Sequence, residues 1–198
     1  TAYHILVASS PELLEQGKGD IWDSGKIESD ASQWITYQGK TLKCNASYYW
    51  KVKIDTNKGA TNWSAPAFWT TGLFNEADWQ GQWIGLDRAA PGDSETQWSR
   101  LAARYLRKEF AVKKSVKRAT VHIAGMGLYE LFINGQRIGN QVLAPAPTDY
   151  RKTILYNTYD VTSLLQTENA IGVTLGNGRF YTMRQNYKPY KIPTFGYP

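Results

Sequence analysis

The sequence contains few of the residues that most often hold metals or carry covalent chemistry. Its 198 residues include one cysteine, Cys44, and two histidines, His4 and His122. One cysteine excludes an internal disulfide, and these residues cannot complete a four-ligand Cys/His zinc site. No apolar run is long enough to cross a bilayer, and the opening TAYHILVASS alternates like a strand, so neither a membrane segment nor a signal peptide is visible. We predict no metal site, no cofactor and no membrane partner.

The positive charge of the chain is concentrated in its second part. Residues 1–78 hold 7 basic and 9 acidic side chains, and residues 79–198 hold 16 and 8, for a net charge of +6. A basic domain can bind nucleic acid. However, the densest basic run, KKSVKR at 113–118, lies between two predicted strands, where a solvated hairpin tip explains it, and no nucleic-acid-binding motif accompanies it. We therefore expect no nucleic-acid partner.

Residues 1–78 predict short antiparallel strands separated by turns. The segment YYWKVKIDT places Tyr48, Trp50, Val52 and Ile54 on one face and Lys51 and Lys53 on the other, as in a half-buried strand with its lysines outside. AYHILVAS alternates in the same way, and IWDSGKI (21–27) contains a Ser-Gly turn. WSAPAFWTTG (63–72) is the last predicted strand, in which Pro66 indicates an edge or a bulge.

Tyr48 indicates the kind of sandwich. It follows Leu42 by six residues at the entry to the long strand, a spacing typical of the tyrosine corner of Ig-like sandwiches, in which the hydroxyl bonds to the backbone upstream. We predict a fibronectin type III, Ig-like domain over residues 1–78. Its first strands are missing from the sequence, so we expect the chain to be a fragment.

Residues 79–198 predict a second all-β domain, truncated at its C-terminal end. An exposed loop at 88–100 is followed by six short strand segments with turn residues between them, which predicts a β-sandwich of jelly-roll, galactose-binding-like type. Asn134-Gly135 predicts a type I′ turn between LYELFI and QRIG. Pro145 and Pro147 block further ladder pairing, so we expect the chain to leave the sheet there and cross over. Asp160 is expected to cap one helical turn in DVTSLL.

The second domain contains, in order, ARYLRKEF, RATVHIAGMGLYELFINGQRIG, LAPAPTDYRKTILYNTYDVTSLL and ENAIGVTLGNGRFY. These segments resemble the N-terminal domain of bacterial α-L-rhamnosidases. The preceding segments AYHILVAS, IWDSGKI, YYWKVKI and FWTTGL are similar to the fibronectin-like module that stands before that domain in the same enzymes. The resemblance covers nearly the whole chain.

This resemblance implies a parent glycoside hydrolase that removes terminal α-L-rhamnose with inversion, through two carboxyl groups on opposite sides of the sugar. In the family both groups lie on a separate (α/α)6 barrel, C-terminal to anything present in this sequence. We therefore predict no catalytic residue in this chain and no activity of the fragment by itself. The implied partners are rhamnose-containing glycans or glycosides and the missing catalytic domain of the same chain. The family also implies a periplasmic or secreted bacterial protein.

Local carboxylates offer no better catalytic pair. Glu109 and Glu130 lie in alternating strands, and Asp149 and Asp160 flank turns, so surface charge and capping explain each of them. His122 lies in the middle of a strand, where a hydrogen-bonded sheet histidine is the simpler explanation than a general base.

Substrate-binding candidates come from residue type and position. Sugars present apolar C–H faces and many hydroxyls, which suit aromatic platforms combined with Asn, Asp or Arg. Asn177, Arg179 and Tyr181 offer these types together at a strand exit, and Trp98 lies on the long loop. The alternative explanation is that Asn177 only forms a turn and that the aromatic residues are packed in the core. Core or half-buried strand positions also explain most of the 8 Trp and 13 Tyr.

Three functions remain open at this point. The chain is an accessory portion of an α-L-rhamnosidase that gives structural support and recognises substrate, a stand-alone carbohydrate-binding module, or a fibronectin-type adhesion fragment. Of these, LGNGRFY and LAPAPTDY favour the first over the third, because an adhesion module does not need them.

Overall fold

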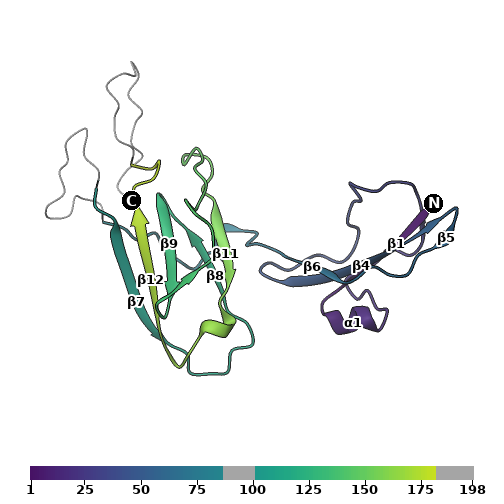
Figure 1. The fold of residues 1–198 in the computed structure, drawn as a ribbon, viewed down its shortest axis with the longest axis horizontal. Helices are drawn as coiled ribbons and strands as arrows, with labels where there is room; N and C mark the ends of the chain where they lie inside the picture. Colours follow the sequence, from purple (N-terminus) through teal and green to yellow (C-terminus); the bar gives the residue numbers. More distant parts are fainter. Residues whose placement is uncertain (87–100, 182–198) are drawn as a thin grey trace, which may run out of the picture. The chain divides into compact units, whose positions relative to one another are not determined.

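The structure, a computed structural model, describes residues 1–86 and 101–181 and divides the chain into two compact units, Thr1–Gly81 and Gln82–Pro198. Both units are built mainly from antiparallel strands (Figure 1), which confirms the all-β prediction. Among the described residues, no helix is long and apolar enough to cross a bilayer.

The first unit contains one antiparallel sheet with the order β2-β1-β4-β5, in which β3 also pairs with β1 and β6 with β4. Its strands are β1 (Ala2–Ala8), β2 (Trp22–Asp23), β3 (Ile27–Glu28), β4 (Ser47–Thr56), β5 (Gly59–Ala60) and β6 (Ala67–Thr70). Ser24 and Gly25 form a bend between β2 and β3, with Gly25 at φ +60°. Both short strands pair with β1, so the bend lies within one edge of the sheet.

A short helix, α1 (Pro11–Glu15), was not predicted from the sequence. Its start nevertheless has a recognisable pattern, with Ser10 at the N-cap position, Pro11 at the first helical position and Glu12 in the first turn. The helix buries Leu14 against Leu6 and Ala8 of β1. One 3₁₀ turn, η1 (Glu76–Asp78), follows near the end of the unit.

The predicted tyrosine corner is present. The Tyr48 hydroxyl accepts a hydrogen bond from the backbone N–H of Lys43 at 2.7 Å, while its ring packs beside Ile5 and Val7 in the main core of the unit. Because this bond fixes the chain upstream of β4, it positions the segment that covers this face of the sheet.

The opposite face of β4 differs from the prediction. Lys51, expected outside, is only 8% exposed, and its Nζ donates a hydrogen bond to the Leu14 carbonyl at the end of α1. Its ammonium group and that of Lys53 lie 5.0 and 5.2 Å from the ring centroid of Trp63. The period-two pattern placed Lys51 correctly on this face, but the face is covered by α1 and Trp63.

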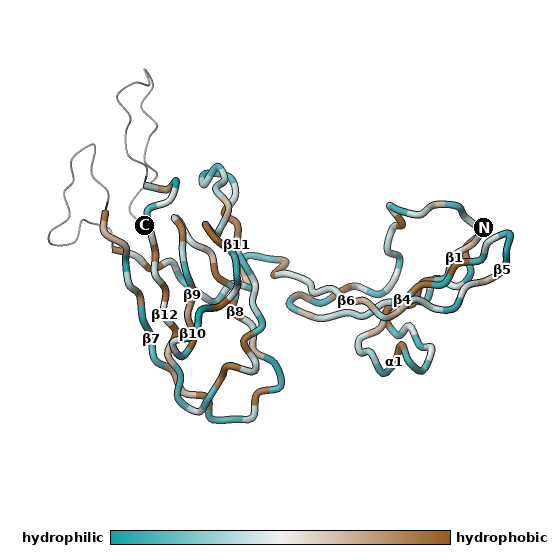
Figure 2. The backbone as a smooth tube through the Cα atoms, viewed as in Figure 1, coloured by the Kyte–Doolittle hydropathy of each residue, from teal (hydrophilic) through white to brown (hydrophobic). Residues whose placement is uncertain are grey.

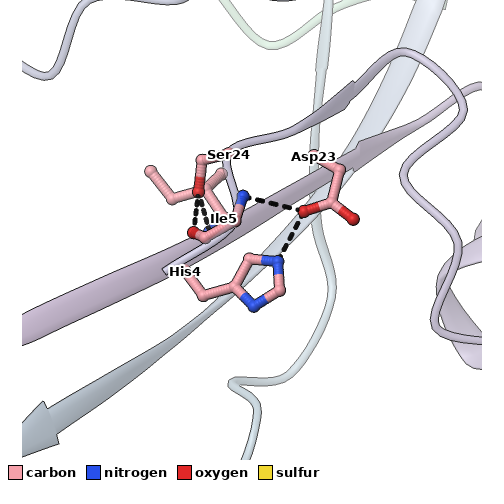
Figure 3. A network of polar contacts seen from close by, with 5 residues as sticks. His4, Ile5, Asp23 and Ser24 are labelled. Atoms are coloured by element: carbon pink, nitrogen blue, oxygen red, sulfur yellow. Dashed lines mark hydrogen bonds and ion pairs between the residues drawn. The ribbon is translucent and has the colours of Figure 1, made fainter. Parts of the chain in front are cut away.

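A polar network fastens the bend between β2 and β3 to β1 (Figure 3). His4 Nε2 lies 2.6 Å from Asp23 Oδ1, which also accepts the Gly25 N–H at 2.9 Å. The Ser24 hydroxyl accepts the Ile5 N–H at 2.8 Å and donates to the Gly25 carbonyl. Each of these polar groups is therefore used to hold the edge of the sheet.

The second unit contains a four-stranded antiparallel sheet, β10-β9-β12-β7, and a two-stranded one, β11-β8. Its elements are β7 (Arg104–Ala111), β8 (Thr120–Ala124), β9 (Leu128–Ile133), β10 (Gln136–Ile138), β11 (Tyr156–Asp160), the 3₁₀ turn η2 (Thr162–Leu164) and β12 (Glu168–Gly176). Tyr129, Leu131 and Leu175 of the larger sheet form a buried cluster with Ala144, and Val121, Ile123 and Tyr159 of the smaller sheet pack against it. Hydrophobic residues accordingly concentrate on strands such as β8 and β9 (Figure 2).

The hairpin at Asn134-Gly135 is formed as predicted. The two residues have φ values of +50° and +81° between paired Ile133 and Gln136, the signature of a type I′ turn. Asn134 is also fixed by its side chain, since Oδ1 accepts the Ala170 N–H at 2.9 Å and Nδ2 donates to Asn169 Oδ1 at 3.0 Å.

The predicted crossover follows this hairpin. The chain leaves β10 at Ile138, forms no strand through the two prolines, and enters β11, which pairs with β8 in the other sheet. Asp160 Oδ1 accepts the Thr162 N–H at 2.9 Å, as predicted, but the turn that follows is 3₁₀ and not α-helical, and its N-cap position is Val161.

Candidate functional site

Three segments meet at one end of the second unit, and we call this region the loop end. It comprises the turn 125–127 before β9, the crossover loop 143–155 and the turn 177–181 that follows β12. In Figure 1 the last two lie at the top of the unit, where β12 points. The strands thus bring together the two segments, LAPAPTDY and LGNGRFY, that the sequence marked as unusual.

Glycines allow the turns to pack backbone against backbone. A Cβ on Gly127, which has φ +140°, would lie 2.2 Å from the Gly176 carbonyl oxygen. A Cβ on Gly178, which has φ +50°, would lie 2.9 Å from the carbonyl carbon of Gly127. Side chains cannot be accommodated at either position, so these glycines fix how the turn after β12 is placed.

Asn177 anchors that turn. Its Nδ2 donates to the Leu101 carbonyl at 3.2 Å, and its own carbonyl accepts the Tyr181 N–H at 3.2 Å. Its Oδ1 is buried and accepts no hydrogen bond from the residues that the structure describes.

Arg179 lies beside the crossover loop. It is exposed, and its charge contributes to lowering the pKa of Asp149 and opposes the rise that burial produces in the pKa of Tyr150. Phe180 is buried next to it, and its ring meets the Tyr150 ring edge-to-face, with centroids 5.4 Å apart. An exposed guanidinium thus stands next to a rigid aromatic pair.

Asp149 and Arg151 form the polar counterpart on the crossover loop. The guanidinium binds the carboxylate through two bonds, Nε to Oδ1 at 3.0 Å and Nη2 to Oδ2 at 3.1 Å. These bonds to Arg151 are the main reason that the pKa of Asp149 is below its ordinary value. The Asp149 carbonyl also accepts the N–H groups of Lys152 and Thr153, so the loop is ordered by its own bonds.

The structure therefore gathers three of the four sequence-predicted residues, Asn177, Arg179 and Tyr181, in one turn. Trp98 lies outside the described residues. The substrate-binding candidates predicted from the sequence did not include Asp149 and Tyr150, which belong to the LAPAPTDY segment and lie in this region. Since their segment and 177–181 both follow strands that end on the same side of the unit, topology could have indicated the meeting.

The four carboxylates that could have formed a catalytic pair have structural partners. Glu109 Oε1 pairs with Arg107, and Glu130 Oε1 with Arg137. Hydrogen bonds from Arg151 hold Asp149 and lower its pKa. Hydrogen bonds from Thr162 do the same for Asp160.

His122, like these carboxylates, has a structural partner. Nδ1 of His122 lies 3.0 Å from the Thr158 hydroxyl, and burial lowers its pKa. Among the residues described, no group of three or more His, Cys, Asp or Glu could hold a metal ion.

Family profiles match both units. Residues 1–75 match the "Rha78A-like, N-terminal immunoglobulin domain", and residues 114–196 match the "Alpha-L-rhamnosidase N-terminal domain". The chain carries the N-terminal domains of the α-L-rhamnosidase family. The loop end, with its crossover loop and its turn after β12, lies within the second rhamnosidase domain, and the tyrosine corner lies within the first.

Curated relatives support the same family. An α-L-rhamnosidase of Formosa agariphila is 40% identical over 95% of this chain, and one of an Alteromonas species is 36% identical over 90% of it. The chain spans about a fifth of the length of these rhamnosidases, 21% and 20% respectively.

Solved rhamnosidases share the fold. The structure of the Dictyoglumus thermophilum α-L-rhamnosidase matches 91% of this chain at 42% identity and a TM-score of 0.81, and the Aspergillus terreus enzyme matches 98% at 32% identity and the same score. This chain covers 21% of each of those proteins.

Proposed function

We propose that this chain is a non-catalytic N-terminal portion of an α-L-rhamnosidase, and that its loop end contributes to recognising rhamnose-containing glycans. The observation that carries the second part is the meeting of Arg179 with the Tyr150–Phe180 ring pair and Asp149. The names of the relatives and of the solved neighbours carry the first part, since these proteins are rhamnosidases. They also favour this function over a fibronectin-type adhesion fragment.

The loop end offers what a deoxysugar requires. Rhamnose has ring hydroxyls on one part of its surface and a methyl group on another. Guanidinium and carboxylate groups bind pairs of hydroxyls through several hydrogen bonds, and these bonds are stronger than those between neutral groups. The aromatic side chains of Tyr150 and Tyr181 offer apolar surface for C–H groups and for the methyl group. We assign hydroxyl recognition to Arg179 and Asp149, and to Asn177 the placing of the turn that carries Arg179.

Hydrolysis is assigned to a part of the parent protein outside these 198 residues. An inverting glycosidase needs a protonated acid and a base separated by about 6.5–9.5 Å across a bound sugar. The four candidate carboxylates of this chain are instead committed to arginines or to a turn amide. The chain therefore serves folding and recognition, and the chemistry is supplied elsewhere.

A hydrolysis assay tests the first part. The full-length parent and the 198-residue chain are compared on an aryl α-L-rhamnoside. We expect release of the aryl group by the parent and none by the chain. Absence of hydrolysis by both would contradict the rhamnosidase assignment, and hydrolysis by the chain would contradict its non-catalytic role.

Calorimetric titration of the chain with L-rhamnose tests the second part. Arg179→Ala removes the exposed guanidinium and is expected to weaken binding about tenfold or more, the loss expected from one charge-assisted contact. Lys114→Ala removes an equal charge from the exposed turn that follows β7 at the other end of that strand, and it should leave binding unchanged. Equal losses in both variants, or none in either, would exclude the loop end as the binding site.

A further inference from the structure

The outer face of the larger sheet in the second unit carries a depression of about 280 Å³. We call it the outer trough. Its residues come from the three neighbouring strands β7, β12 and β9, and those that define it are Tyr105, Arg107, Phe132, Ala170, Gly172 and Thr174. The loop end lies beyond the C-terminal end of β12, so the two regions use different residues.

Strand alternation explains the trough. In β12, Ile171, Val173 and Leu175 belong to the core, so Gly172 and Thr174 face outward. Gly172 forms an open floor, because a Cβ there would meet only the Cβ of Phe132, at 3.8 Å.

Aromatic side chains border this floor. Gly172 pairs with Phe132 on β9, and Thr174 pairs with Tyr105 on β7. Since neighbouring strands lie about 4.8 Å apart, the bordering strands are separated by roughly 10 Å, which leaves room for one sugar ring between them. Tyr105 is 81% exposed, so its ring is available for stacking against a ligand.

The charges on this face are balanced. Arg107 Nη2 lies 2.5 Å from Glu109 Oε1, and Arg137 Nε lies 3.1 Å from Glu130 Oε1. Arg137 is held further by donating to the Gln141 carbonyl at 2.8 Å. Each cation is neutralised by a neighbouring carboxylate, so the face attracts neither a polyanion nor a cation and yet presents donors and acceptors side by side.

We propose that the outer trough is a binding site for a neutral saccharide, separate from the loop end. A pyranose ring stacks its C–H face on Tyr105, lies over Gly172, and places hydroxyls against the Arg107–Glu109 pair and Glu130. A flat sugar ring can lie on the glycine floor. A protein partner would find few protruding side chains there to interdigitate with its own. The balanced charges favour a neutral glycan over an acidic one.

The test is an NMR titration of the 198-residue chain. The probes are neutral hexasaccharides of glucose, xylose, mannose and galactose and the neutral rhamnoside naringin. Oligogalacturonate serves as the acidic control. We expect at least one neutral probe to shift the amide signals of Tyr105, Gly172 and Phe132, and the acidic probe to bind more weakly. Tyr105→Ala should weaken this binding about tenfold, and Gly172→Val, which fills the floor with a residue that strands favour, should abolish it. Phe68→Ala removes a comparably exposed aromatic, 68% exposed, from the first unit and should have no effect.

Several results would overturn the proposal. One is the absence of any shift at the trough with every neutral probe, and another is binding that neither Tyr105→Ala nor Gly172→Val changes. The third is a dimer in sedimentation that Tyr105→Ala dissociates, which would show a second copy on this face. Failure here is distinguishable from failure of the proposed function. Rhamnose binding that is lost in Arg179→Ala, together with no shift at the trough for any neutral probe, leaves the loop end intact and removes only the trough.

Discussion

The two units of the chain use their polar and aromatic residues differently. In the first unit the most elaborate polar groups hold the fold itself, as in the Tyr48 hydroxyl bond, the His4–Asp23 pair and the buried Lys51 ammonium. In the second unit, polar and aromatic residues lie on the loops beyond the strands, where Arg179 remains exposed beside the Tyr150–Phe180 pair. Side chains committed to holding a sheet are not available for a ligand, and this difference supports our proposal that the second unit contributes to recognition.

Net charge follows the same division. The segment up to residue 78 is slightly acidic, whereas the remainder carries the positive excess. Part of that excess lies in the exposed turn after β7, away from both proposed sites. Charge alone would therefore have directed attention to the end of the second unit opposite the proposed loop-end site.

The largest expected effect comes from breaking the glycine packing of the second unit. Gly127→Ala places a methyl group against the Gly176 carbonyl at a backbone conformation that alanine rarely adopts, and it should lower the free energy of unfolding by about 3 kcal/mol. Chemical denaturation measures the loss, and hydrogen exchange should show it in β9 and β12 and not in β1 and β4. Gly172→Ala, at the open floor of the outer trough, is the matched control and should change stability by less than about 0.5 kcal/mol. An equal loss in the two variants would mean that close packing is not the cause.

A smaller effect is expected from breaking the tyrosine corner of the first unit. Tyr48→Phe removes the acceptor of the Lys43 N–H and should cost about 1–2 kcal/mol, with loss of exchange protection confined to the first unit. Tyr3→Phe removes a hydroxyl from another ring of the same core and should cost much less. If rhamnose affinity at the loop end also fell in Tyr48→Phe, the separation of roles between the units would be wrong.

The smallest effect concerns the Asp23 network. A hydrogen bond from the Gly25 N–H, together with His4, lowers the pKa of Asp23, so the ionised form stabilises the folded state. A lowered pKa contributes stability above the unfolded value of about 3.9, and this contribution is lost as the pH falls through the folded pKa. Because Asp23 is largely exposed, we expect Asp23→Asn to cost less than about 1 kcal/mol at pH 7. The difference from the wild-type chain should begin to shrink below about pH 4 and should be lost only once the pH is below the lowered pKa of folded Asp23.

Thermal denaturation of the two chains from pH 7 to pH 3 measures this change. Asp30→Asn, an exposed aspartate of the same unit, is the control. A cost for Asp23→Asn that stayed constant from pH 7 to pH 3 would show that the network stabilises the unit by some means other than the carboxylate charge.

The sequence predicted the features whose causes are local. Asn134-Gly135 can adopt two left-handed conformations in succession, so the turn and its hairpin followed from two residues. The alternation around Tyr48 gave the long strand, and its spacing from Leu42 gave the corner. The helix α1 was missed although Ser10 and Pro11 marked its start, because five residues show too little of a helical period to be recognised.

The tertiary structure alone decided which distant groups meet. Period-two alternation could assign Lys51 to a face of its strand, but it could not show that α1 covers that face. In the same way, residue types made Asn177, Arg179 and Tyr181 candidates, but only the crossing of the chain between two sheets brings Tyr150 onto Phe180 and Asp149 near Arg179. Local patterns fix the conformation of each segment, whereas contacts between segments depend on how the sheets pack, and that packing is set by the whole core.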